Sequence, residues 1–144
     1  MDYKQLADEF MQKMYVLSKA RPQRKLHDSM QGETFVLHYI LHHGDSVLPS
    51  EICKIMGISS ARIAAALNGL ESKGVITRRI DTSDRRRILV DLTPKGKAMA
   101  EEQRQEMLEN TSKLLSLLGE DDAREYVRLT GKLADFITAH KFPE

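Results

Sequence analysis

The sequence has almost no cysteine and no long apolar run. Cys53 is the single cysteine in 144 residues, so a disulfide within the chain is excluded and a reducing compartment is the expected setting. No stretch approaches the roughly 18 apolar residues that a membrane span needs. The first ten residues mix charged and apolar side chains and do not resemble a signal peptide. We therefore expect a cytoplasmic protein without a membrane partner.

Common enzyme motifs are also missing. The sequence contains no nucleophile elbow, no phosphate-binding glycine loop and no H-E-x-x-H pair, so we expect neither enzymatic activity nor a cofactor. A content of 41% hydrophobic and 30% charged residues is typical of a globular protein. The length suits one domain over residues 1–144.

The charge is unevenly distributed along the chain. Residues 49–97 carry ten basic and five acidic side chains, a net of +5, whereas residues 98–144 carry six and ten, a net of −4. Residues 1–48 balance at six of each. A basic central segment is typical of nucleic-acid contact, although a solvated charged face is the simpler alternative.

The spacing of apolar residues and the positions of glycine, proline and capping residues predict a mainly α fold with a small β-hairpin. Helices are expected from Tyr3 to about residue 20, over Glu33–His42, from Pro49 to Gly57, from Ser59 to Gly74, from Thr93-Pro94 to about Leu118, and after Gly119; strands are expected at residues 75–80 and 86–92. Two short helices followed by a hairpin predict a winged helix-turn-helix at residues 30–97.

Both ends of the chain are predicted to form a helical dimerisation region. Residues 1–20 and 98–144 carry apolar faces that are wider than one core needs. Tyr15, Val16, Leu129 and Phe136 lie outside the main apolar stripes. Wide exposed apolar faces usually mark an interface, so we expect a homodimer.

The helix that begins at Ser59 has a candidate recognition face opposite its apolar stripe. That face consists of Ala61, Ala65, Asn68 and Ser72 and is flanked by Arg62. Asn68 can read an adenine edge, the alanine methyls suit thymine, and Arg62 suits guanine or phosphate. Ser59 and Ser60 at the helix N-terminus suit a phosphate. The alternative is an ordinary solvated helix.

The hairpin concentrates five arginines within ten residues, namely Arg78, Arg79, Arg85, Arg86 and Arg87. With only two aspartates nearby, at positions 81 and 84, we expect the arginines to be too dense for a stabilising set of ion pairs. Guanidinium groups match phosphates and the narrow minor groove, so we predict DNA contacts by Arg78, Arg85, Arg86 and Arg87. A solvated turn is the alternative.

These segments resemble the MarR family of winged-helix regulators. The resemblance rests on LPSEICKIMGIS, ARIAAALNGLESKGVITR and DTSDRRRILVDLTPKG, and is strongest from Leu48 to Gly96. It implies a transcription regulator, a repressor released by a small ligand, that binds a pseudo-palindromic operator in double-stranded DNA as a homodimer. It further implies that the helix from Ser59 enters the major groove and that Arg86, supported by Asp84, enters the minor groove.

The resemblance also implies a small aromatic effector, for which Tyr15, Phe35, His38 and Tyr39 are the candidate ligand-binding residues. Aromatic side chains at helical spacing are more often part of the core. Cys53 follows Ile52 inside a short helix, where free cysteine usually behaves as a small hydrophobe rather than a redox sensor.

Two further functions stay open. His38 and His42 lie one helical turn apart, close in sequence to His27, Glu33 and His43, and can share a zinc ion. Zinc sensors that resemble this chain supply a second histidine pair from the helix after the hairpin, which here has none. We therefore predict no metal site and expect partly exposed histidines near a helix end. The other alternative is a winged helix that binds proteins without binding DNA.

Overall fold

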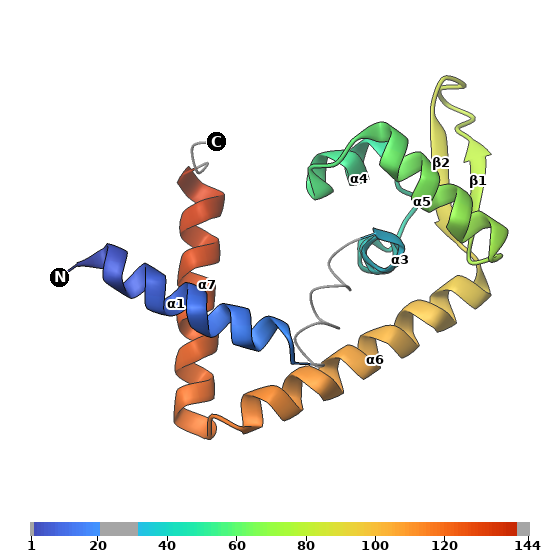
Figure 1. Ribbon diagram of the computed structural model, residues 1–144. Coiled ribbons are helices and arrows are strands. Elements are labelled where there is room, and N and C mark those ends of the chain that lie inside the picture. Colours follow the sequence, from blue (N-terminus) through green and yellow to red (C-terminus); the bar gives the residue numbers. More distant parts are fainter. Residues whose placement is uncertain (1, 21–31, 141–144) are drawn as a thin grey trace. The chain divides into compact units, whose positions relative to one another are not determined.

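The computed structural model describes residues 2–20 and 32–140, and the chain divides into two compact units at residues 1–107 and 108–144. The described elements are α1 (Tyr3–Ser18), α3 (Gly32–His43), α4 (Pro49–Met56), α5 (Ser60–Ser72), β1 (Ile76–Ile80), β2 (Ile88–Leu92), α6 (Pro94–Ser116) and α7 (Glu120–His140) (Figure 1). The predicted fold class, mainly helical with one antiparallel hairpin, is confirmed.

Local signals separate α4 from α5. Pro49 lies in the first turn of α4, and Gly57 ends that helix with φ of 63°, in the left-handed region that favours glycine. The Ser59 hydroxyl accepts a hydrogen bond of 3.3 Å from the backbone N–H of Arg62 and so caps α5. Because only three residues separate the helices, α4 and α5 are joined by a tight turn.

One hydrophobic core joins α3, α4, α5 and the hairpin. Its buried members are Val36, Leu37, Ile40, Val47, Ile52, Ile63, Leu67, Leu70, Val75, Ile76, Val90 and Ala100. Half-buried Cys53 packs against this cluster, as expected for a small hydrophobe. Burial of Ile63, Leu67 and Leu70 fixes the rotation of α5, so its opposite face is exposed.

The hairpin pairs β1 with β2 from Ile76↔Leu92 to Ile80↔Ile88. Since side chains alternate along a strand, Arg78 and Arg79 lie on opposite faces. The second strand was expected to begin at residue 86, but β2 begins at Ile88. Arg86 and Arg87 instead belong to the turn, which is closed by a 2.9 Å hydrogen bond from the Arg87 N–H to the Asp84 carbonyl.

Gly96 lies in the first turn of α6 against the backbone of Val75. A Cβ atom at Gly96 would lie 1.8 Å from the Val75 carbonyl oxygen, so the backbone would have to shift. We expect Gly96→Ala to lower the free energy of unfolding by about 1–3 kcal/mol or more. Gly131→Ala in α7, where nothing lies within 4 Å, should instead be stabilising by about 0.5–1 kcal/mol. Equal urea midpoints for the two variants would contradict this close contact.

The helices near the two ends of the chain are exposed along their apolar faces. α1 and the part of α7 up to residue 139 contain no buried residues. Their exposed large apolar side chains are Tyr3, Leu6, Phe10, Met11, Tyr15, Val16 and Leu17 in α1, and Tyr126, Val127, Leu129, Leu133, Phe136 and Ile137 in α7. Among the described residues, no helix combines the length and apolarity that crossing a bilayer requires.

Candidate nucleic-acid interface

The outer face of α5 combines small side chains with one unpaired cation. Ala61, Arg62, Ala65 and Asn68 are exposed, as their predicted place opposite the apolar stripe requires. Within residues 2–20 and 32–140, Arg62 makes no ion pair. Short side chains allow a groove floor to approach the helix closely.

The N-terminus of α5 presents polar groups beside this face. Ser59 and Ser60 are both exposed. The Ser59 hydroxyl oxygen accepts the capping hydrogen bond, which leaves its proton free to donate. The first N–H groups of a helix lack intrahelical acceptors and carry a partial positive charge, so this end of α5 suits a phosphate.

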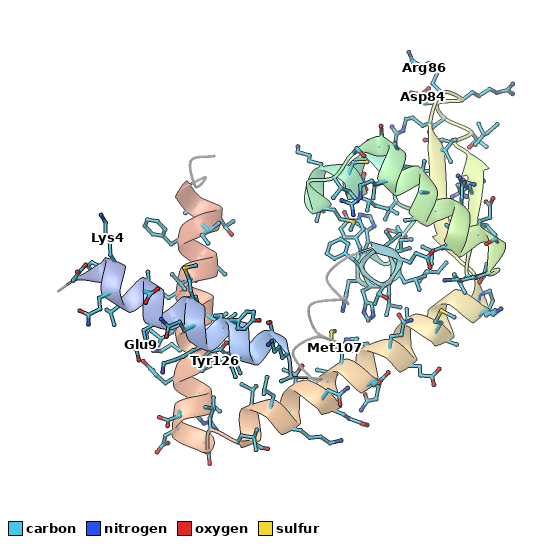
Figure 2. The ribbon with its side chains drawn as sticks, viewed as in Figure 1. Lys4, Glu9, Asp84, Arg86, Met107 and Tyr126 are labelled. Carbon is cyan, nitrogen blue, oxygen red and sulfur yellow. The ribbon has the colours of Figure 1, made fainter. Side chains whose placement is uncertain are left out.

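Asp84 holds Arg86 at the tip of the wing, far along the hairpin from α6 (Figure 2). The Asp84 carboxylate accepts from the Arg86 backbone N–H at 3.1 Å and from Arg86 Nε at 3.2 Å. The hydrogen bond from the Arg86 side chain lowers the pKa of Asp84, so the carboxylate stays charged. The side chain of Arg86 is nevertheless 91% exposed. This arrangement restrains the guanidinium without covering it.

The expectation that the hairpin arginines are too dense for ion pairs is wrong. Besides Arg86, three more arginines pair with carboxylates: Arg78 with Glu71, Arg79 with Asp91, and Arg87 with Asp81. Glu71 comes from α5 and Asp91 from β2. These two carboxylates lie outside the loop and are not considered in the sequence prediction, which uses only the two aspartates of the loop. Among the described residues, Arg85 is the wing arginine without an ion pair.

Arg79 belongs to a polar cluster on the other side of the hairpin. Its Nε donates to Asp91 Oδ2 at 2.9 Å, and its second nitrogen donates to the Ser46 hydroxyl at 2.9 Å. Ser46 donates in turn to Asp91. Because Ser46 is 33 residues from Arg79 in the chain, no local sequence signal predicts this contact.

Arg78 is less available than predicted. Its guanidinium donates to Glu71 at 3.1 and 2.9 Å and to Oδ1 of Asn68 at 2.7 Å. The hydrogen bond to Glu71 raises the pKa of Arg78 and lowers that of Glu71, so both stay charged. Only 28% of the Arg78 side chain is exposed. Arg78 is therefore mainly engaged with side chains of α5 and is largely shielded from solvent.

The four candidate effector residues occupy different environments. The rings of Phe35 and Tyr39 are stacked with centroids 6.3 Å apart, and Tyr39 packs against the core. His38 is buried, whereas Tyr15 of α1 is 64% exposed with Lys19 Nζ 4.4 Å from its ring centre. A groove in the unit of residues 1–107 is lined by α3, the segment after α3, β2 and Lys97. None of the four candidate residues lines this groove.

His38 is buried rather than partly exposed, which corrects the expectation for this histidine. Both of its ring nitrogens, and Oε1 of Gln103 in α6, are buried without a hydrogen-bond partner among the described residues. Burial is the main cause that lowers the pKa of His38, and the charges of His42 and Arg104 add to it, while Gln103 and Glu101 oppose it.

Stability should therefore fall as the pH is lowered below the ordinary histidine pKa of about 6.5. Between that value and the lowered pKa of the folded state, His38 is protonated in the unfolded chain but neutral in the folded chain, so protonation favours unfolding. We expect His38→Leu to reduce the loss of unfolding free energy between about pH 7.5 and 5.5. The matched variant at exposed His43, His43→Leu, should keep the wild-type loss. If urea unfolding shows that wild type and His38→Leu lose the same unfolding free energy over this pH range, His38 does not have this role.

No group of three His, Cys, Asp or Glu side chains converges on a metal-sized site within the described ranges. His42 is exposed, and His38 of the same helix is buried. His27, the third candidate ligand, lies outside the described residues.

Known proteins resemble this chain in sequence and in structure. The sequence model of the MarR family matches residues 30–87. The chain is 31% identical over 123 residues to the HTH-type transcriptional repressor MdtR of Bacillus subtilis, covering 83% of this chain and 79% of MdtR. It is 29% identical over 98 residues to the HTH-type regulator YdgJ of the same species, covering 68% of this chain but 60% of YdgJ.

Among solved structures, the YusO protein from Bacillus subtilis has a TM-score of 0.70 and 28% identity, covering 94% of this chain and 99% of YusO. The sequence likeness to MdtR and the structural likeness to YusO both extend well beyond the winged helix. The chain therefore belongs to the MarR family of winged-helix transcription regulators.

Proposed function

We propose that this regulator is a transcriptional repressor that binds a pseudo-palindromic operator as a homodimer. The observation that carries the proposal is Arg86, held by Asp84 at the tip of the wing yet 91% exposed. A restrained, solvent-facing guanidinium is suited to the narrow minor groove because little side-chain entropy remains to be lost on binding. MdtR, which this chain resembles, is named a repressor.

In this proposal α5 lies in the major groove. Arg62 and Asn68 contact base edges, Ala61 and Ala65 allow the close approach, and Ser59 and Ser60 hold a phosphate. Arg85 and Arg87 contact phosphates beside the wing. The proposed dimer interface is formed by the exposed apolar side chains of the helical parts at 1–20 and 98–144. A small aromatic ligand near Tyr15, Phe35, His38 and Tyr39 is the proposed effector.

The salt dependence of DNA binding tests this proposal against a winged helix that binds proteins. A labelled mixed-sequence duplex is titrated with full-length protein between about 50 and 200 mM salt. The logarithm of the association constant should fall linearly with that of the salt concentration, with a slope of about −0.9 for each phosphate contacted. No binding at the lowest salt would contradict the proposal.

A further inference from the structure

Asn68 is a base-reading candidate on α5, and its side-chain amide is held by another side chain. Oδ1 of Asn68 accepts a hydrogen bond of 2.7 Å from the Arg78 guanidinium. Arginine has only donors, so the group that faces it must be the amide oxygen and the NH2 group must point elsewhere. The contact therefore defines which end of the amide is available.

Glu71 fixes the arginine that orients this amide. It accepts from two nitrogens of Arg78 at 3.1 and 2.9 Å, a two-point contact that fixes the plane of the guanidinium. Glu71 and Asn68 lie three residues apart on α5, and Arg78 reaches both from β1. Hydrogen bonds thus link the Glu71 carboxylate through Arg78 to the Asn68 amide, an arrangement called the relay below.

Adenine recognition requires both ends of an asparagine amide, because the NH2 group donates to N7 and the oxygen accepts from the N6 amino group. Here one of the two lone pairs of the oxygen already accepts from Arg78. The positive charge of the adjacent guanidinium also disfavours a second N–H donor at the lone pair that remains. Guanine presents two acceptors, N7 and O6, at its major-groove edge and no donor there. An amide whose NH2 group is free and whose oxygen is occupied by a cationic donor therefore matches guanine better than adenine.

We infer that Arg78 is a positioning residue that makes Asn68 a donor-only reader, selecting guanine over adenine at one position in each half-site. The inference rests on the proposed function and replaces the adenine preference that the sequence suggests. Arg78 acts through Asn68 and needs no contact with a base.

The test is selection of binding sites from a random duplex library by full-length protein, with Asn68→Ala used to locate the position that Asn68 reads. Wild type should prefer guanine to adenine there by about five-fold or more, and Asn68→Ala should lose preference at that position alone. The paired variant Glu71→Gln with Arg78→Met removes the relay without changing net charge. It should bring the guanine-to-adenine ratio close to one or invert it.

The matched control is Asp91→Asn with Arg79→Met, which removes a charge-neutral ion pair on the same hairpin that does not contact Asn68. It should keep the wild-type ratio. Thermal melting establishes that each variant is folded before selection. A wild-type preference for adenine, or an unchanged ratio in the variant without the relay, would overturn the inference. A wild-type protein that enriches no sequence would instead contradict DNA binding itself.

Discussion

Replacing Leu133 and Ile137 of α7 by glutamate should convert the protein to a monomer and weaken operator binding by about 10²–10⁴-fold. These side chains are 66% and 50% exposed on the apolar face of α7. In a dimer each glutamate would have to be buried without a partner, which is costly. A monomer then binds each half-site independently and loses the effective concentration that links the two.

The control variant places two glutamates on the opposite face of α7, at Gly131 and Thr138. A Cβ atom at Gly131 meets nothing within 4 Å, and Thr138 is exposed. Net charge changes equally in both variants, so only position differs. Sedimentation should show a dimer for the control and a monomer for Leu133→Glu with Ile137→Glu. A dimer in both cases would contradict the proposed interface.

Arg86→Ala should produce the second largest effect. Loss of one groove contact costs about 1–3 kcal/mol, and an operator-bound dimer loses two such contacts, so affinity should fall by about 30-fold or more. The fold should be unaffected because Arg86 is 91% exposed at a turn. Fluorescence anisotropy with the selected operator measures the loss, and urea unfolding establishes unchanged stability.

Arg124→Ala is the matched control for this prediction. Arg124 also pairs with a carboxylate, Glu120, and is 76% exposed, but it lies on α7. The variant removes the same charge and the same kind of ion pair outside the winged helix. Its operator affinity should stay within about two-fold of wild type, since exposed ion pairs contribute little. Equal losses for the two variants would mean that net charge, rather than the wing, determines affinity.

Sequence alone predicted the elements because their signals are local. Ser59 caps α5, Gly57 ends α4, and the stripe that includes Ile63 and Leu67 fixes which face of α5 is exposed. Each signal acts within a few residues, where propensity and capping dominate. The contact between Asp84 and Arg86, two residues apart, is equally local and followed from the family resemblance.

The contacts that sequence reasoning missed are tertiary. Pairing of Arg79 with Asp91 depends on hairpin register, and pairing of Arg78 with Glu71 depends on how β1 packs beside α5. Burial of His38 depends on the α6 side chains packed near it. None of these contacts follows from spacing, so the sequence predicts unpaired arginines and a partly exposed His38.

In the proposed function, a dimer reads DNA with two copies of α5 and two wings. The most direct measurement is sequencing the DNA that full-length protein captures from the genome of its source organism. The captured fragments should share an inverted repeat whose half-site centres lie one helical turn apart, about 10 base pairs or 34–36 Å. Captured DNA that shares no repeated half-site, or no DNA above background, would contradict this mode of binding.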